Sequence, residues 1–328
     1  MKLSTFLAAV ASLLCASLAP AQIHFQGKEG PGKGKKVVLL AGDEEYRSEE
    51  VMPMLAKILS EHHGFDTTVV FSINPTTGEV DPNTKDNNPG LEALDNADLC
   101  IMLLRFRAWP DNQMKHFAGY VAAGKPIIGL RTSTHAFNGL KGTYQSFNSF
   151  GKTVLGEQWV SHWGKHKSEA TLGLIEEAAK SDPLLRGVTN LFGDTDVYEA
   201  YPPADAKILA RGQVLKGMTA DSGGADYVKK RSTDKMEQGV NSPMMPVIWT
   251  RENKLENGKT NKILTTTMAS SSDLKTEDLR RVIINGAYLF TGLEVPAKAK
   301  VDIVGEFAGS FYGFNAFIKG KKPEDYAK

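Results

Sequence analysis

Four aliphatic runs, each followed by a polar turn, most constrain how this chain can fold. They lie at residues 36–41, 66–71, 97–104 and 126–130. Apolar segments of this kind, unbroken in VVLLAG (37–42) and LCIMLL (99–104), are typical of strands buried on both faces of a parallel sheet. Helical patterns at 48–64 and 110–124 separate them, each beginning with acidic or capping residues and ending at a glycine. This alternation predicts a doubly wound, mainly parallel α/β sheet with helices on both faces.

The second half of the chain has a more mixed pattern. Further strands are predicted at 168–175, 196–200, 206–212, 245–250 and 262–267, followed by a helix capped by Thr276. A polar, Gly-rich surface loop is predicted at 218–244. We expect one α/β domain over 36–293, after a flexible leader at 22–35 that is rich in Gly, Lys and Pro. The aromatic side chains of the tail, 294–328, predict that it packs back on the domain.

The N-terminus reads as a signal peptide over residues 1–21. Lys2 supplies a positive charge, an apolar stretch follows, and Ala19-Pro20-Ala21 is a small-x-small cleavage pattern. The alternative is an N-terminal membrane anchor, but the apolar stretch is short for a span of about 20 residues. We therefore expect export to the periplasm or beyond, with Gln22 as the first mature residue.

The charge balance argues against strongly charged partners. Cleavage would remove one of the 39 Lys and Arg residues, leaving 38 basic residues against 38 acidic ones. Neither nucleic acid nor an anionic membrane is expected to bind such a chain by charge. A neutral small molecule fits better, and an oligomer is left open. Cys100 would be the single mature cysteine; it lies inside an apolar run and is interpreted as a buried hydrophobe.

Polar side chains gather where the predicted strands end. In open α/β sheets, ligands bind outside the carboxyl ends of the strands. The residues that follow the strands, which we take as site candidates, are Asp43, Glu45 and Arg47; Arg105 and Trp109; and Arg131, Ser133 and His135. A run of three serines follows the strand at 262–267. The alternative is that such turns are polar because they meet water.

We assign these candidates to two roles. His135 is the leading proton shuttle, because an unperturbed imidazole titrates near neutrality, with Asp43 or Glu45 orienting it or acting as partner base. Substrate binding is assigned to Arg47, Arg105, Trp109, Arg131, Ser133 and His162. An arginine fork suits carboxylates, vicinal hydroxyls or a developing oxyanion, and an indole offers a flat face to a sugar ring. The alternative for Arg131 is a salt bridge with Asp43.

The segment LGEQWVSHWGKH places His162 and His166 four residues apart, on one face if the segment is helical. This is a spacing of metal ligands, but no Glu follows the first His as in HExxH. We therefore assign no metal, and a structural or substrate-contacting pair is favoured. The chain also lacks the phosphate-binding and nucleophile-elbow motifs GxxxxGK[ST], GxGxxG after a strand, and GxSxG, so no nucleotide cofactor is expected.

Several segments in order resemble the ThuA-like (trehalose utilisation) family, in particular its secreted members. They include KKVVLLAGDEEYRSEE, GKPIIGLRTSTHAF, LGEQWVSHWGKH and VDIVGEFAGSFYGFNAF, and the resemblance covers about residues 36–320. It implies a flavodoxin-like sheet related to the class I glutamine amidotransferases. The turn after PIIGL carries Arg131-Thr132-Ser133 where those enzymes place a cysteine, and Met268 to Ser270 lacks their later histidine.

The resemblance therefore implies an amidotransferase-like fold without amidotransferase activity. The family's link with trehalose implies a role in carbohydrate metabolism. We expect acid–base chemistry on a sugar or keto-sugar, as an isomerase, lyase or hydrolase, without a cofactor. The alternative is a non-catalytic sugar-binding or scaffold protein on the same fold.

Overall fold

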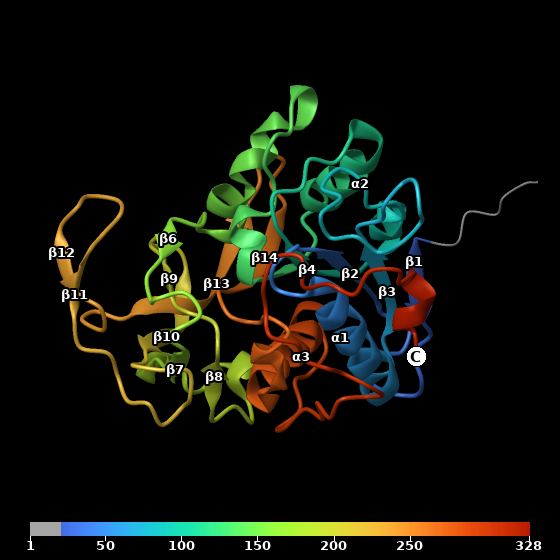
Figure 1. The fold of residues 1–328 in the computed structure, drawn as a ribbon. Coiled ribbons are helices and arrows are strands. Elements are labelled where there is room, and N and C mark those ends of the chain that lie inside the picture. Colours follow the sequence, from blue (N-terminus) through green and yellow to red (C-terminus); the bar gives the residue numbers. More distant parts are fainter. Residues whose placement is uncertain (1–20) are drawn as a thin grey trace, which may run out of the picture.

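A ten-stranded sheet forms the centre of the molecule in the computed structural model, which describes residues 21–328 (Figure 1). Its strand order is β1-β3-β2-β4-β5-β14-β13-β10-β7-β8. The strands are β1 (Gln22–Phe25), β2 (Lys36–Gly42), β3 (Asp66–Phe71), β4 (Leu99–Leu104), β5 (Ile127–Leu130), β7 (Thr171–Ile175), β8 (Leu191–Gly193), β10 (Lys207–Val214), β13 (Met245–Lys254) and β14 (Thr260–Thr266). The helices are α1 (Ser48–His63), α2 (Asp111–Ala122) and α3 (Glu277–Phe290).

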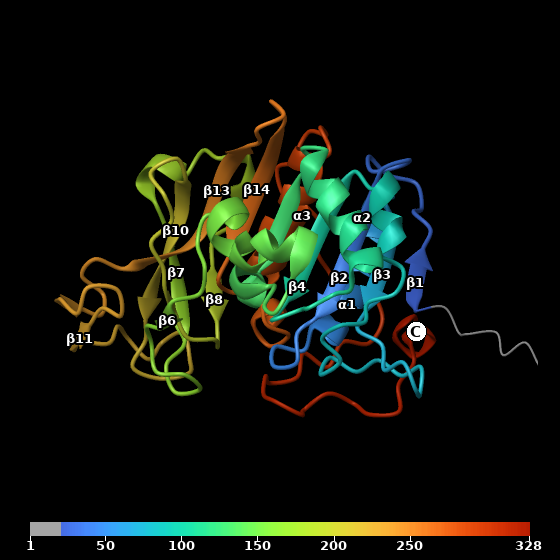
Figure 2. The same cartoon turned by 90° about the horizontal axis from the view of Figure 1, so that it is seen from above.

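Five neighbouring strands, β3, β2, β4, β5 and β14, run parallel. Helices α1 and α3 bury their apolar sides against one face of this region, and α2 packs against the other (Figures 1 and 2). Successive strand residues point to opposite faces, so each unbroken aliphatic run contributes to both cores. The predicted α/β sheet with helices on both faces is confirmed.

The other half of the sheet is antiparallel. Strands β13, β10, β7 and β8 extend it beyond β14, each antiparallel to its neighbour. The strand predicted at 196–200 is instead β9 (Tyr198–Glu199), which pairs with β6 (Ser161–His162) in a separate small sheet. The loop predicted at 218–244 contains a hairpin of β11 (Val228–Lys230) and β12 (Glu237–Gly239), which projects from the body (Figure 1).

The flexible leader predicted at 22–35 is corrected by the structure. Gln22–Phe25 forms β1, which pairs antiparallel with β3 at the edge of the sheet. Beyond it, Gly27 N–H donates to Asp66 Oδ1 at 2.9 Å. A Cβ on Gly27 would lie 2.1 Å from the carbonyl oxygen of Gly64. The glycine here permits a close backbone approach to the end of α1, which composition alone does not distinguish from flexibility.

The tail, residues 294–328, lies against the domain beside α1 and the loop after β2 (Figure 2). Gly313 N–H donates to the carbonyl of Glu45 at 2.8 Å. Ser310 N–H donates to Glu50 Oε2 at 3.0 Å, and Arg47 Nη1 donates to the carbonyl of Ala316 at 2.5 Å. The start of α1 therefore anchors the tail over the carboxyl ends of the parallel strands.

No helix among residues 21–328 is both long enough and apolar enough to cross a membrane. The predicted signal peptide lies outside the described residues, apart from Ala21.

Glu49 lies buried where α1 meets the tail. Its Oε1 accepts from Arg47 Nε at 2.7 Å, while its Oε2 is buried without a hydrogen-bond partner among the described residues. Burial raises the pKa of Glu49 to about 7, although Arg47 opposes that rise. Because its folded pKa exceeds the ordinary value of 4.5, Glu49 favours folding most when protonated. That contribution is lost as the pH rises through about 7.

We predict that Glu49→Gln removes this pH dependence. From about pH 5 to about pH 8, the wild type should lose stability relative to the variant, because only the wild type must charge a buried carboxyl. Melting temperatures of both proteins across this range measure the difference. Glu177→Gln, at a solvent-exposed carboxylate, is the matched control. Parallel curves for the wild type and Glu49→Gln would contradict the prediction.

Candidate functional site

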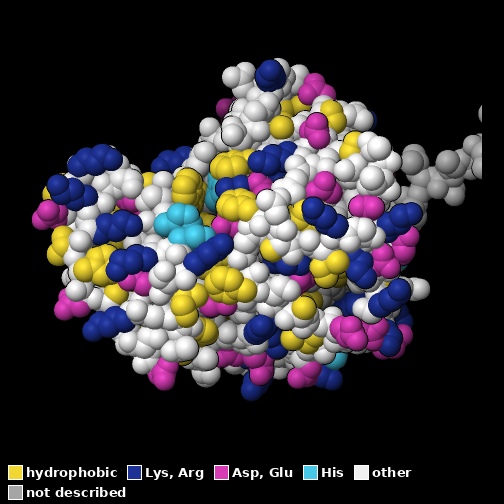
Figure 3. Space-filling view, in the orientation of Figure 1, with side chains coloured by type: hydrophobic (Ala, Val, Ile, Leu, Met, Phe, Trp, Pro, Cys, Tyr) yellow, Lys and Arg dark blue, Asp and Glu magenta, His cyan; other side chains and the backbone are white. Residues whose placement is uncertain are grey.

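A cavity of about 230 Å³ lies at the carboxyl ends of the parallel strands. It lies near the boundary between β2 and β4, where the order of successive strands in the sheet changes direction. Such a topological switch point is the usual place for a ligand in an open α/β sheet. Figure 3 shows histidine side chains in a hollow among hydrophobic ones. The lining residues are Glu45, Arg105, Phe106, His135, Trp159, His162, His166, Tyr198 and Phe314.

Asp196, between β8 and β9, organises one wall of this cavity. Its carboxylate is completely buried and contacts His162 Nδ1 at 2.8 Å and His166 Nδ1 at 2.9 Å. Arg131 Nη2 donates to the same carboxylate at 3.1 Å. Although burial acts to raise it, Arg131 and the two histidines hold the pKa of Asp196 well below its usual range. Asp196 is therefore a fixed negative charge that positions both imidazoles.

His166 connects Asp196 to Glu45. Its Nε2 lies 3.2 Å from Glu45 Oε1, on the opposite side of the ring from the Asp196 contact. The hydrogen bonds to Asp196 and Glu45 raise the pKa of His166 to about 9, against the effect of burial. The segment that carries His162 and His166 is not helical: His162 ends β6, and His166 lies in the turn that follows. Their ring centroids nevertheless lie 4.4 Å apart, because both rings contact Asp196.

Arg131 lies beneath the cavity rather than in its lining. Its Nη1 donates to the carbonyls of Asp196 at 2.8 Å and Thr267 at 2.5 Å. The guanidinium carbon lies 3.7 Å from the ring centroid of Tyr198 and 4.8 Å from that of Tyr46. The salt bridge considered with Asp43 is thus replaced by one with Asp196. With no exposed surface, Arg131 is placed to hold Asp196 rather than to touch substrate.

Asp43 shapes the loop that presents Glu45. Its Oδ1 accepts from the backbone N–H of Glu45 at 2.7 Å and from that of Tyr46, and its Oδ2 accepts from the Thr132 hydroxyl. Burial, with the charge of Glu44, raises the pKa of Asp43 to about 6. Asp43 does not line the cavity, so its expected role as the partner of His135 is replaced by a role in positioning Glu45 through the backbone.

His135 reaches the cavity but lacks the expected carboxylate. Its ring lies 5.0 Å from that of Phe106 and 5.4 Å from that of Trp159, by centroid. The hydroxyl of Thr134, 3.3 Å from Nδ1, is its side-chain polar contact among residues 21–328. Burial, with the nearby positive charge of Arg105, lowers the pKa of His135 well below 6.5. This direction favours the neutral imidazole, which does not support His135 as a shuttle that titrates near neutrality.

Of the remaining candidates, Arg105 and His162 line the cavity and three do not. Trp109 is 2% exposed, and its Nε1 donates to Asn88 Oδ1 at 2.8 Å, so it offers no open face to a sugar. Ser133 Oγ donates to the carbonyl of Met102 at 2.8 Å and ties the turn to β4. Arg47 binds Glu49, Glu50 and the tail. A side chain that follows a strand can point into the protein core or into the cavity. The sequence pattern does not distinguish these two directions.

The structure adds residues that sequence reasoning did not assign to the site: Phe106, Trp159, His166, Asp196, Tyr198 and Phe314. Trp159 and His166 belong to the segment already singled out for its histidines. Asp196, Tyr198 and Phe314 follow no buried aliphatic run, so no local signal marks them. The indole N–H of Trp159 is buried without a partner among the described residues. Buried donors are nearly always paired in folded proteins, so this unpartnered N–H is an exception.

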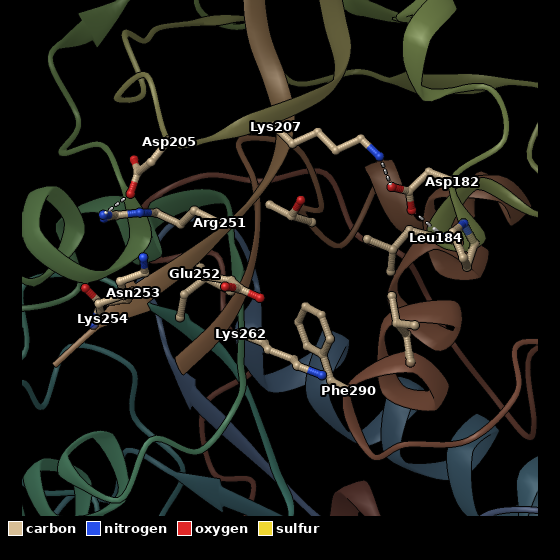
Figure 4. A pocket seen from close by; sticks show the side chains of 14 residues that line it. Asp182, Leu184, Asp205, Lys207, Arg251, Glu252, Asn253, Lys254, Lys262 and Phe290 are labelled. Carbon is tan, nitrogen blue, oxygen red and sulfur yellow. Dashed lines mark hydrogen bonds and ion pairs between the residues drawn. The ribbon is translucent and has the colours of Figure 1, made fainter. Parts of the chain in front are cut away.

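A larger groove, of about 780 Å³, lies at the opposite end of the parallel strands, near the start of β14 (Figure 4). The start of β10, the end of β13 and the last turn of α3 contribute to it. Two of its cations are already paired, because Lys207 lies 2.6 Å from Asp182 and Arg251 lies 2.9 Å from Asp205. The strand-end cavity, with its carboxylate–histidine chain, is therefore the better candidate site.

Comparison with known proteins identifies the fold. No protein-family model matches the sequence, and no curated protein matches it significantly. A crystal structure from Parabacteroides merdae, of a protein described as ThuA-like, is similar with a TM-score of 0.50 and 13% identity, over 90% of this chain and 100% of that one. A second, from Bacteroides uniformis and similarly described, has a TM-score of 0.43 and 12% identity, over 81% and 95% of the two chains. At such identities the first likeness shows a shared fold.

We predict that Arg131→Lys destabilises the protein. Lysine keeps the charge but loses the fork that reaches Asp196 and two carbonyls, and hydrogen bonds of charged groups contribute about 1.5–3 kcal/mol each. The free energy of unfolding should fall by at least about 2 kcal/mol, measured by urea denaturation. Arg231→Lys, on the projecting hairpin, should change it by less than about 0.5 kcal/mol. Unchanged stability of Arg131→Lys would show that Arg131 does not support this wall.

Proposed function

We propose that this chain is an exported ThuA-like protein of carbohydrate metabolism that acts on a sugar or keto-sugar by acid–base chemistry. Support comes from the sequence resemblance over residues 36–320 and from the fold shared with a structure described as ThuA-like. The observation that carries the proposal is the position of Glu45: it contacts His166 at 3.2 Å and lines the same cavity as several aromatic rings.

The cavity has the groups that bind a neutral ring. Phe106, Trp159 and Tyr198 supply aromatic surface, on which the apolar face of a sugar can stack. Glu45, His162 and His166 add polar groups that can bond to hydroxyl or carbonyl oxygens. Arg105, whose side chain is 18% exposed, adds charged donors while its ion pair with Glu44 holds it in place. These groups recognise oxygen atoms on a compact, uncharged molecule.

Glu45 is the group placed to move a proton. It takes a proton from a substrate carbon beside a ketone, the electron pair moves to the ketone oxygen, and Glu45 returns the proton to a neighbouring position. Arg105, on the same cavity, stabilises the negative charge that develops on that oxygen. The contact from His166 fixes the Glu45 carboxylate. The alternative function is sugar binding without turnover, which needs the aromatic rings and Arg105 but no proton transfer.

Glutamine amidotransfer is not proposed. The turn after β5 carries Arg131-Thr132-Ser133 in place of the cysteine nucleophile. Cys100 lies inside β4, completely buried, and burial raises the pKa of its thiol far above the usual value. It can neither reach a substrate nor form a thiolate readily.

Turnover and binding can be separated with two variants. We predict that the wild type converts at least one member of a panel of trehalose, 3-keto-trehalose and related glycosides, followed by NMR. Glu45→Gln should keep binding but lose at least about 100-fold in rate, the usual size of a general-base effect. Trp159→Ala should weaken binding, and Glu61→Gln, at a partly exposed carboxylate on α1, is the matched control.

The results discriminate between the two functions. Binding without turnover across the panel would support the non-catalytic alternative. An absence of binding, measured by calorimetry and NMR line broadening, would reject both. Equal rates for Glu45→Gln and wild type would remove Glu45 from the chemistry while leaving the sugar proposal in place.

Export is a separate proposal, supported by the N-terminal sequence pattern. Cleavage after Ala21 would leave β1 intact, because that strand begins at Gln22. We predict that the protein recovered from the periplasm or medium of an expressing bacterium begins at Gln22. Intact-mass spectrometry, which also detects a cyclised N-terminal glutamine, measures this directly. A recovered protein that still begins at Met1 would contradict the proposal.

A further inference from the structure

His162, His166 and Asp196 bring three metal-ligating side chains together at the wall of the cavity. One potential ligand atom from each lies within 4.8 Å of the others, and no other group of three His, Cys, Asp or Glu side chains meets that condition among residues 21–328. We propose that these three residues bind a divalent transition-metal ion of the zinc type. This inference does not depend on the sugar proposal.

The ligand atoms are already near the separations that a metal requires. The Nδ1 atoms of His162 and His166 lie 2.8 Å and 2.9 Å from the two oxygens of Asp196. A tetrahedral ion with ligands at about 2.0–2.1 Å holds neighbouring ligand atoms roughly 3.3 Å apart. His162 and His166 contact different oxygens of Asp196, so the side chains must shift to bring one atom from each residue, now within 4.8 Å of one another, to that spacing. The ion would replace the protons that now lie between the imidazoles and the carboxylate.

The surrounding groups match the outer shell of a metal site. Histidine ligands usually donate their second ring N–H to a carboxylate or carbonyl, which fixes the tautomer. His166 has this arrangement, because Nε2 lies 3.2 Å from Glu45 Oε1 while Nδ1 faces Asp196. Arg131 holds Asp196 in place. Its positive charge opposes a bound cation, so the site should bind more weakly than one without it.

The position of the three ligands leaves one side of the ion open. Asp196 is completely buried, whereas the side chains of His162 and His166 are 35% and 27% exposed and line the cavity. Solvent or a ligand oxygen could complete the coordination from the cavity. Two imidazoles and one carboxylate suit zinc and its neighbours in the first transition row, whereas magnesium and calcium prefer oxygen ligands.

Isothermal titration of the tag-free chain, stripped with chelator, tests the site with ZnCl₂ as the probe. We expect one Zn²⁺ per chain, and His162→Ala and His166→Ala should each weaken binding at least tenfold. His116→Ala is the matched control. His116 also contacts a carboxylate, Asp95 at 2.9 Å, but it belongs to no group of three potential metal ligands among the described residues. It should bind like the wild type, and MgCl₂ should give no binding heat.

Glu45→Gln provides a second readout on geometry. If Glu45 orients His166 on the ion, this variant should weaken zinc binding by about 10–100-fold without abolishing it. With Co²⁺ in place of zinc, the wild type should show the visible absorption of a low-coordinate nitrogen–oxygen site, and the double variant H162A/H166A should not. Melting curves without metal establish that each variant is folded.

Two results would overturn the inference. One is zinc binding by the wild type that is no tighter than binding by folded H162A/H166A. The other is an equal loss of affinity in His116→Ala, which would indicate binding by surface histidines in general. Zinc is titrated without sugar, so a protein that binds zinc at this site but no sugar would keep this inference and reject the sugar proposal.

Discussion

The buried pair of Arg131 and Asp196 is the interaction on which the rest of the site depends. Asp196 has no exposed surface, and Arg131 compensates the cost of burying its charge. Held in this way, Asp196 positions His162 and His166 with its two oxygens. His166 then reaches Glu45 on the opposite loop. The buried carboxylate of Asp196 thus determines the orientation of His162 and His166, which are partly exposed.

The two halves of the sheet meet at this pair. Arg131 follows β5 in the parallel half, whereas Asp196 follows β8 at the end of the antiparallel half. The carbonyl of Thr267, after β14, accepts from Arg131 where the halves join. The antiparallel strands therefore do more than lengthen the sheet. Asp196 lies in the segment that follows β8 and leads into β9, so this half of the sheet also contributes to the site. The tail closes the opposite side, with Phe314 in the lining and Arg47 anchoring it to α1.

The parallel half, and the strand ends that carry the candidate cavity, could be predicted from sequence because buried parallel strands have a strong local signature. Helices α1, α2 and α3 could be predicted for the same reason, since their apolar periodicity is local. Side-chain direction at the strand ends could not be predicted: Trp109 and Ser133 turn inward to Asn88 and Met102. Asp196 could not be found either, because its partners lie 65, 34 and 30 residues away in the chain.

The turn after β5 shows how this fold can keep its geometry and change its chemistry. Arg131 there has a positive φ of 41°, a backbone conformation that ordinary residues adopt only under strain. The sequence resemblance implies that related amidotransferases carry a cysteine at this turn. Here it presents a guanidinium to a buried carboxylate, and the rings of Tyr46 and Tyr198 enclose it. The unusual backbone conformation at Arg131 therefore serves a buried charge pair. The polar groups that face the cavity come from the loop after β2, from the residues after β4 and β5, and from β6 with its following turn. A substitution of Arg131 should act on the cavity through Asp196 and its histidines, because Arg131 has no exposed surface and does not line the cavity.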